Sequence, residues 1–310
     1  GVAAVSENKQ SQFKSSAVLF DLPKQEKTRS FLKVQDGCDG FCAYCQIPYA
    51  RGSSKSVPKQ DIINAAETLL NNGTCELVLT GIHIGDYGKD FLPPQNQETF
   101  SSLVASLVKL QKLKRLRISS LEPSEVSDSL IRCLYENKDI VCDHFHLPLQ
   151  SGSDRILKLM GRSYTCSEYK KTVETIRSFF PNCQISADII PGFPQETEDD
   201  FAQTVDFIKS CNLSSLHVFP YSKRPNTRAL KMPGHLPAHV IKERSQILQS
   251  LSKGQLRQYG SQFLGKRLEV LWESQKNGRT VFAKPHRSSK KEGVSGPYSS
   301  VVPLYMERAL

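Results

Sequence analysis

Six short segments, most of which contain β-branched residues, alternate with longer segments of helical periodicity between residues 31 and 221, and this alternation constrains the fold more than any other feature. The expected strands are Phe31–Gln35, Glu76–Thr80, Arg115–Ser119, His144–Leu149, Gln184–Ile190 and Ser215–Tyr221. The expected helices between them are Lys59–Asn71, Thr99–Leu110, Asp128–Glu136, Ser167–Phe180 and Thr197–Ser210. Strands that alternate with helices form a parallel sheet, so we predict an α/β fold, either doubly wound or curled into a partial barrel.

A change of pattern after residue 260 predicts a second, smaller domain. A long helical segment, Pro237–Tyr259, ends the alternating unit, and Arg267–Glu273 and Arg279–Ala283 then have the composition of strands. Residues 1–28 are polar and irregular, so we expect a linker there, a core domain over 29–260 and a small β domain over 261–310. Because no stretch approaches the apolar length of a membrane span or a signal core, we expect a cytoplasmic protein.

Basic residues are concentrated near the C-terminus. Residues 251–310 hold 11 Lys and Arg against 4 Asp and Glu, a net charge of +7 out of +10 for the whole chain. A nearly neutral body with a basic tail is typical of a catalytic domain joined to a module that binds a polyanion. A solvated basic surface remains the alternative interpretation.

Three closely spaced cysteines form the strongest site signal. Cys38, Cys42 and Cys45 follow the first expected strand, whereas the other cysteines are scattered, as in a reduced compartment. Thiolate sulfur selects zinc or iron–sulfur clusters. A structural zinc site generally takes a fourth ligand from a second Cys or His pair, which the sequence lacks. An iron–sulfur cluster with one iron open to a substrate or cofactor is therefore favoured over zinc or accidental clustering.

The order of several motifs resembles that of a known enzyme superfamily. Cys38, Cys42 and Cys45 form a CxxxCxxC pattern with an aromatic residue before the third cysteine, which resembles the radical S-adenosylmethionine (SAM) superfamily. The run from Lys33 to Gly52 looks like its methylthiotransferase branch. The further matching motifs are Leu79–Gly88, Arg117–Pro123, His146–Gly152, Met160–Thr165, Asp188–Pro194 and Tyr221–Arg224.

The resemblance implies a fold and two cofactors. In this family the strand unit is a partial (β/α)6 barrel, and the basic tail is a small RNA-binding β-barrel of the TRAM type, which looks incomplete here. Cys38, Cys42 and Cys45 would hold a [4Fe–4S] cluster, and SAM would chelate its open iron through the amine and carboxylate. Tyr44 and Phe41 would shield the cluster, although ordinary packing explains both aromatic side chains equally well.

Residues after the remaining strands are expected to bind SAM. By the resemblance, the segment at Thr80 and Gly81 meets the methionyl end, although glycine at such a place often marks only a tight turn. The other expected cofactor contacts are Tyr44, Ser120, Glu122, Gln150, Ser151, Asp188, Ile190, Phe219 and Tyr221. Glu122 has an alternative role as a helix cap, and Asp188 and Ile190 have one as packed strand residues.

Several basic residues are candidates for contact with RNA phosphates. They are Arg51, Arg162 and Arg224 in the core and Lys266, Arg267 and Arg279 in the tail. Surface solvation is the alternative for each core arginine. His83, His144 and His146 have no recognisable metal-binding spacing, and His217 is expected to be a packed strand residue. No catalytic residue is expected beyond the cluster ligands.

The segment around His83 separates members of the methylthiotransferase branch. The isopentenyladenosine enzymes usually have an amide at this position and the ribosomal-protein enzymes a carboxylate, whereas the sequence here resembles the threonylcarbamoyladenosine enzymes. The resemblance therefore implies a transferase of class EC 2.8.4.5, which adds a methylthio group to C2 of N6-threonylcarbamoyladenosine 37 in tRNA. The alternatives are the two sibling reactions, another radical SAM reaction, and a non-enzymatic RNA-binding protein with a structural metal.

One departure from the family pattern concerns a second cluster. The family has an N-terminal domain whose three cysteines bind a second [4Fe–4S] cluster, and no cysteines of this chain match them. We therefore expect the second cluster only in a longer protein. The expected partners are the tRNA anticodon loop and a reducing electron donor such as flavodoxin or ferredoxin. No interaction with a membrane is expected.

Overall fold

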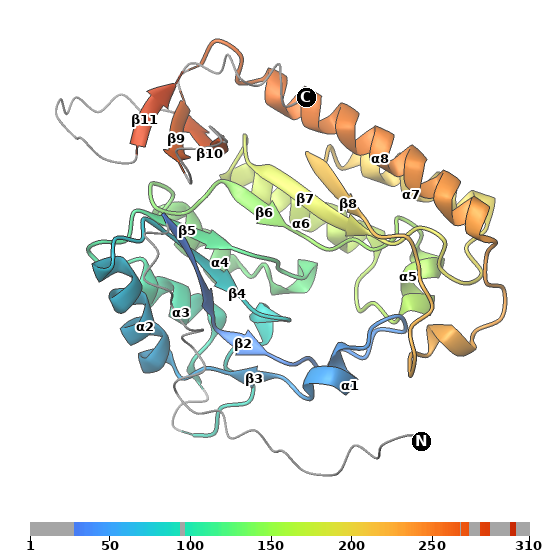
Figure 1. Ribbon diagram of the computed structural model, residues 1–310, viewed down its shortest axis with the longest axis horizontal. Coiled ribbons are helices and arrows are strands. Elements are labelled where there is room, and N and C mark those ends of the chain that lie inside the picture. The colour runs from blue at the N-terminus through green and yellow to red at the C-terminus, as the bar shows by residue number, and fades with distance from the viewer. Residues whose placement is uncertain (1–27, 94–96, 267, 273–279, 286–297, 302–310) are drawn as a thin grey trace, which may run out of the picture.

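The core of the structure is an open barrel of parallel strands that follow one another in chain order (Figure 1). The computed structural model describes residues 28–93, 97–266, 268–272, 280–285 and 298–301. One three-stranded parallel sheet has the order β1–β4–β5, and another has the order β6–β7–β8. The strands are β1 (Arg29–Lys33), β4 (Glu76–Thr80), β5 (Arg115–Ile118), β6 (His144–His146), β7 (Gln184–Ile189) and β8 (Ser215–Val218).

The two sheets join through β5 and β6, which decides between the two topologies that the sequence allows. Leu116 in β5 forms a parallel bridge with Val141, just before β6. A doubly wound sheet reverses its strand order at a switch point, whereas the order here follows the chain throughout. The partial barrel is therefore confirmed.

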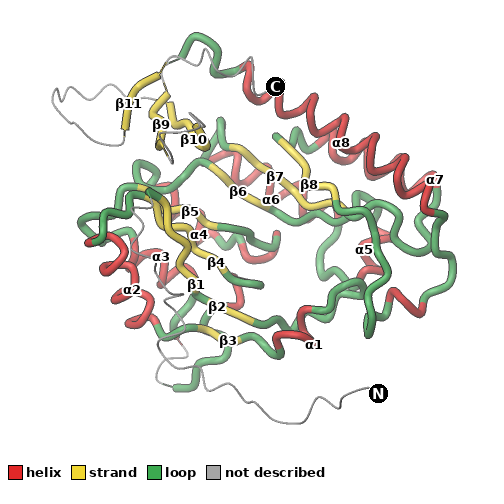
Figure 2. Tube along the Cα trace, viewed as in Figure 1, coloured by secondary structure: helices red, strands yellow, loops and turns green. Residues whose placement is uncertain are grey.

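Helices cover the outer side of both sheets (Figure 2). They are α2 (Lys59–Asn71), α3 (Phe100–Leu107), α4 (Asp128–Glu136), α5 (Asp154–Met160), α6 (Cys166–Phe179), α7 (Glu198–Ser210) and α8 (Ala238–Ser261). The helix α2 is typical: it buries Ile62, Ala66 and Leu69 on one face, at the spacing of successive helical turns. No described helix has both the length and the apolar character that crossing a membrane requires.

The strand β7 shows why the barrel interior is polar. Ile185, Ala187 and Ile189 point one way, into the hydrophobic core that the helices share. Ser186 and Asp188 alternate with them and point the other way, where they contact histidines of the neighbouring strands. The inner face of this sheet is therefore available for a site.

Most of the expected elements are present, but β6 and β8 are shorter than expected. The expected strand His144–Leu149 ends at His146 and the expected strand Ser215–Tyr221 ends at Val218, each two residues before a proline, which has no N–H for a strand ladder. Several short elements were not expected from the sequence. They are β2 (Gln35–Asp36), α1 (Ile47–Arg51), β3 (Lys55–Ser56), α5, and the 3-10 turns Ile84–Asp86, Pro123–Glu125 and Ala229–Lys231.

Beyond α8, the described residues form a small antiparallel sheet of order β10–β9–β11. Its strands are β9 (Leu268–Trp272), β10 (Thr280–Pro285) and β11 (Tyr298–Val301). The two strands expected from the sequence are thus present as β9 and β10, and β11 was not expected. The TRAM-type barrel, its completeness and the domain boundaries stay predictions. The expected linker over residues 1–28 lies outside the described residues, apart from Thr28.

Candidate functional site

The three cysteines lie in a loop that a short antiparallel pair of strands closes. Gln35 and Asp36 in β2 pair with Ser56 and Lys55 in β3, so the loop between them returns to its starting point. Gly37 has a φ of +73°, and a Cβ on it would lie 2.1 Å from the carbonyl oxygen of Ser53. Only glycine fits there, which explains its place directly before the first cysteine.

Each cysteine sulfur in the loop accepts an N–H donor. The backbone N–H of Gly40 donates to Cys38 Sγ at 3.3 Å, and that of Ile47 donates to Cys45 Sγ at 3.4 Å. The third sulfur, Cys42 Sγ, lies 3.2 Å from Arg162 Nη1, which donates to it. Hydrogen bonds of this kind stabilise thiolates and tune the clusters that thiolates hold.

The thiols are also close enough to affect one another. Burial raises the pKa of Cys45, and the neighbouring Cys42 and Cys38 raise it as well. Neighbouring thiolates repel one another because all are negatively charged, and a metal cation that binds all of them removes this repulsion. The donor set of three sulfurs with directed N–H groups therefore fits a soft metal site such as an iron–sulfur cluster.

Arg162 connects the cysteine loop to the barrel. Its side chain is only 8% exposed and forms an ion pair with Glu122. The same guanidinium lies 3.5 Å from the hydroxyl oxygen of Tyr44 and 3.2 Å from that of Tyr164. Burial lowers the pKa of Arg162, but Tyr164 and Glu122 outweigh burial and keep it charged. A solvated surface role for Arg162 is therefore wrong, and Glu122 combines an ion pair with a position at the N-cap of the 3-10 turn Pro123–Glu125.

His83 lies beside the cysteine loop, a position that the sequence did not indicate. Its Nδ1 is 3.8 Å from Cys38 Sγ and 3.1 Å from an Asp86 carboxylate oxygen, and its Nε2 is 2.5 Å from Glu125 Oε1. Burial lowers the pKa of His83, but Asp86, Cys38 and Glu125 outweigh burial and raise it to about 12. The raised pKa favours the protonated imidazole at neutral pH. The spacing argument against His83 fails, because the fold brings one ligand atom each of His83, Asp86 and Glu125 within 4.8 Å of one another.

Gln35 is a positioning residue that the sequence analysis missed. Its fully buried side chain donates from Nε2 to the carbonyl of Gly37 at 2.8 Å and to Ser54 Oγ at 2.9 Å. Its Oε1 accepts the backbone N–H groups of Ile82 and His83, each at 2.9 Å. Gln35 thereby ties the cysteine loop to the loop after β4. The signal that could have identified it is an amide side chain at the end of the first expected strand, shortly before the first cysteine, where a buried amide can bind the backbone of two loops.

Replacing Gln35 with Leu is expected to destabilise the protein and loosen the cysteine loop. Five hydrogen bonds of the side-chain amide would be lost. The cost is about 1–3 kcal/mol for each buried partner that finds no new hydrogen bond. The measurement is urea unfolding, together with iron uptake on reconstitution. A matched change at the exposed Gln60 on α2 provides the control, and equal stability of the two variants would contradict the role of Gln35.

The other expected cofactor residues divide into those that are partly exposed at strand ends or have a side-chain atom without a hydrogen-bond partner in the described part of the chain, and those that have other contacts. Gln150 has a positive φ of 68°, and its buried Oε1 has no hydrogen-bond partner among the described residues. Thr80, Gly81, Ser120 and Ile190 are all partly exposed at or just beyond the ends of their strands. Such positions suit contact with a ligand at the carboxyl edge of the sheet.

Ser151, Phe219 and Tyr221 were expected to contact the cofactor, and they differ in exposure and in contacts with the protein. Ser151 is buried, and its hydroxyl lies 3.2 Å from that of Thr204 on α7. Phe219 is 53% exposed. The ring of Tyr221 is buried and stacks on His235 at a centroid distance of 5.9 Å. Ser151 and Tyr221 thus have structural contacts that the sequence did not reveal.

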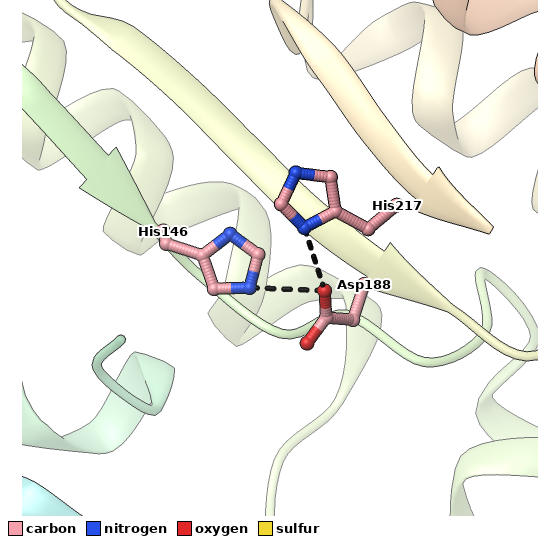
Figure 3. Close-up of side chains that lie close together, drawn as sticks. All are labelled: His146, Asp188 and His217. Carbon is pink, nitrogen blue, oxygen red and sulfur yellow. Dashed lines mark ion pairs between the residues drawn. The ribbon is translucent and has the colours of Figure 1, made fainter. Parts of the chain in front are cut away.

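Asp188 lies between two histidines on the inner face of the second sheet (Figure 3). Its Oδ1 is 3.0 Å from His146 Nε2 and 3.3 Å from His217 Nδ1. Burial raises the pKa of Asp188, but the two imidazoles outweigh burial and lower it to about 2. The expectation that His217 is a packed strand residue is wrong, because its side chain is 58% exposed. The spacing argument against His146 also fails, since neighbouring strands bring distant residues together.

The candidate RNA contacts outside the barrel are exposed where the structure describes them. Arg51 lies 3.3 Å from Asp36, and Arg224 has an exposed side chain. Lys266 is exposed, with its ammonium 6.0 Å from the ring centre of Phe263. Arg267 and Arg279 lie outside the described residues. These contacts stay predictions.

Comparison with known proteins identifies the superfamily. The family model described as "Radical SAM superfamily" matches residues 32–208. The chain is 39% identical over 80% of its length to threonylcarbamoyladenosine tRNA methylthiotransferase MtaB of Bacillus subtilis, of which it covers 54%. It is 37% identical over 81% of its length to the tRNA-2-methylthio-N(6)-dimethylallyladenosine synthase of Syntrophus aciditrophicus, of which it covers 54%. The chain thus spans about half the length of these curated relatives.

A solved structure supports the fold. Coproporphyrinogen III oxidase (HemN) from Escherichia coli, described as a radical SAM enzyme, aligns with a TM-score of 0.53 at 16% identity. The alignment covers 84% of this chain and 58% of the oxidase. It supports the α/β core described above.

Proposed function

The chain belongs to the radical SAM superfamily, and we propose that it is the core of an enzyme that adds a methylthio group to C2 of N6-threonylcarbamoyladenosine 37 in tRNA. The observation that carries the proposal is the cysteine loop, in which every sulfur accepts an N–H donor. The identity to relatives named as threonylcarbamoyladenosine tRNA methylthiotransferases supports the choice of substrate. The motif around His83 favours the same choice.

Radical SAM proteins use a [4Fe–4S] cluster and SAM. When both are bound, they would supply an electron that cleaves the sulfonium of SAM and so gives a carbon-centred radical. Cys38, Cys42 and Cys45 are the residues that would hold the cluster. Gln35 and Gly37 fix the loop that presents them, and neither residue is free to move without breaking buried contacts.

Arg162 and Glu122 would orient the cofactor next to the cluster. Both side chains lie at the cysteine loop, one of them in contact with Cys42 Sγ, and together they offer a cation and an anion. Those are the charges that complement the carboxylate and ammonium of an amino acid. Gln150, with its unsatisfied Oε1, is the proposed hydrogen-bonding partner for the nucleoside.

The proposed substrate is tested by mass spectrometry of tRNA nucleosides. Cells that carry the gene should contain the 2-methylthio derivative of N6-threonylcarbamoyladenosine, and cells without it should contain only the unmodified parent. Restoring the gene with Cys42→Ala should fail to restore the product, because Cys42 belongs to the cluster site. Loss of the 2-methylthio derivative of isopentenyladenosine instead would support the sibling reaction, which the relative from Syntrophus aciditrophicus also suggests.

The basic tail is proposed to supply much of the affinity for tRNA through phosphate contacts. Residues 251–310 carry a net charge of +7. Each contact with a single-stranded phosphate should contribute about 0.7 to the slope of log affinity against log salt. Deleting residues 264–310 should therefore flatten this slope and weaken tRNA binding, as measured by a salt titration of both proteins. An unchanged slope would mean that the barrel holds the tRNA.

A further inference from the structure

Three adjacent strands place two imidazoles and a carboxylate around one point in the barrel. His146 comes from β6, Asp188 from β7 and His217 from β8, and Figure 3 shows their polar atoms converging. One nitrogen of each histidine and one oxygen of Asp188 all lie within 4.8 Å of one another. This group, here called the His–Asp–His triad, is separate from the cysteine loop in sequence and in its donor chemistry.

The contacts of the two imidazoles leave Asp188 Oδ1 without a well-directed hydrogen bond among the described residues. Asp188 Oδ1 is buried and accepts no hydrogen bond of acceptable geometry within the described part of the chain, although both imidazoles lie within 3.3 Å of it. A buried carboxylate oxygen without a directed donor is uncommon. Nitrogen and oxygen ligands at about 2.1 Å from one metal ion lie roughly 3.0–3.4 Å apart, depending on the coordination geometry. The two distances to Oδ1 match that spacing.

The surroundings of the triad also fit a metal ligand set. His146 Nδ1 lies 2.8 Å from Ser186 Oγ, which fixes the ring so that Nε2 faces Asp188. The rings of His146 and His217 are stacked, with a centroid distance of 5.0 Å. Histidines that bind metals typically form a hydrogen bond through the ring nitrogen that does not bind the metal, and this bond orients the ring.

The triad has an approach from solvent. The exposed side chain of His217 forms one of its edges, whereas His146 is nearly buried. His144 in β6 interacts electrostatically with His146 and His217 of the triad, and also with Arg117 in β5 and Glu76 in β4 of the other sheet. An ion could therefore enter from the side of His217.

We propose that His146, Asp188 and His217 bind one divalent transition-metal ion of the zinc class. Two imidazoles and one carboxylate are ligands that such ions accept, and three protein ligands leave a coordination position for water or for an oxygen of a substrate. None of the residues of the site belongs to the cysteine loop, so metal binding here does not depend on the cluster. The site shares Asp188 with the expected nucleoside contact, so its test is made without SAM.

The test is zinc binding to the 310-residue chain after anaerobic reconstitution of the cysteine loop with iron and sulfide. Dialysis against buffered free zinc, followed by elemental analysis, should find one zinc per chain in addition to the iron. His217→Ala and His146→Ala should each weaken binding by more than about 100-fold, since even partners that only orient a ligand contribute roughly 10–100-fold. Ser186→Ala should weaken zinc binding by the smaller factor of roughly 10–100-fold, because Ser186 only orients His146. Cobalt in place of zinc should show no thiolate-to-metal charge-transfer band.

His239→Ala is the matched control, because it removes an exposed imidazole on α8 that lies outside the triad. It should bind zinc as the unchanged chain does. Iron content equal to that of the unchanged chain will show that the His217→Ala and His146→Ala variants are folded. Absence of the additional zinc, or unchanged zinc affinity in both folded variants, would overturn the proposal.

Discussion

Cys42→Ala is expected to eliminate the iron–sulfur cluster. The chain reconstituted with iron and sulfide should bind about four irons, as one cubane cluster requires. Cys42 Sγ is the sulfur that accepts the charged Arg162 donor, so its removal takes away a ligand and one of the hydrogen-bond partners of the buried guanidinium. Iron analysis, the visible chromophore and the electron spin signal of the reduced protein are the measurements.

Cys75→Ala provides the control for Cys42→Ala. Cys75 is also a partly exposed free thiol, but it lies before β4 and its Sγ donates to the carbonyl of Gly73 at 3.6 Å. Iron content and spin signal should be unchanged in this variant. A complete cluster in Cys42→Ala would contradict the assignment of the cysteine loop.

Glu76→Gln should be among the most destabilising single changes in the barrel. Glu76 in β4 is fully buried, and its two carboxylate oxygens each accept an Nε–H at 2.7 Å, one from Arg115 and one from Arg117. Breaking a buried charge network by removing one partner costs about 3–5 kcal/mol. Urea unfolding at pH 7 measures the loss in the free energy of unfolding. Glu67→Gln on the exposed face of α2 is the control.

The effect of Glu76→Gln should depend on pH. Burial raises the pKa of Glu76, but Arg117 and Arg115 outweigh burial and lower it below its ordinary value of 4.5. A carboxylate with a lowered pKa contributes stability above its unfolded pKa and loses that contribution as the pH falls through the folded pKa. The difference in the free energy of unfolding between Glu76→Gln and the unchanged chain should therefore become smaller below about pH 4.5. A difference that stays constant across this range would contradict the ionic role of Glu76.

The local features of the site were predictable from sequence because they depend on short-range pattern. The spacing of the three cysteines and the loop after the first strand were recognised directly. The helix α2 was expected with its observed bounds, because proline at its start and an apolar stripe along one face mark it clearly. Strand ends were less predictable, since a proline two residues further on ended both β6 and β8 early.

The contacts between distant segments were not predictable from one sequence. Arg162 is separated from Cys42 by 120 positions, and Gln35 from His83 by 48, yet both pairs are in contact. His217 alternates with apolar neighbours in a way that resembles a packed strand residue, but it faces the open barrel interior. Only the order of the strands decides which side chains meet there.

The most direct test of the central claim is whether this chain cleaves SAM. The cysteine loop, Arg162 and the barrel edge are all described within the core, so the chain reconstituted anaerobically should produce 5′-deoxyadenosine from SAM when a strong reductant is added. The product is measured by chromatography and mass spectrometry, with Cys42→Ala as the inactive control. We expect product from the unchanged chain and none from Cys42→Ala. A chain that carries a complete four-iron cluster and forms no 5′-deoxyadenosine would contradict the account.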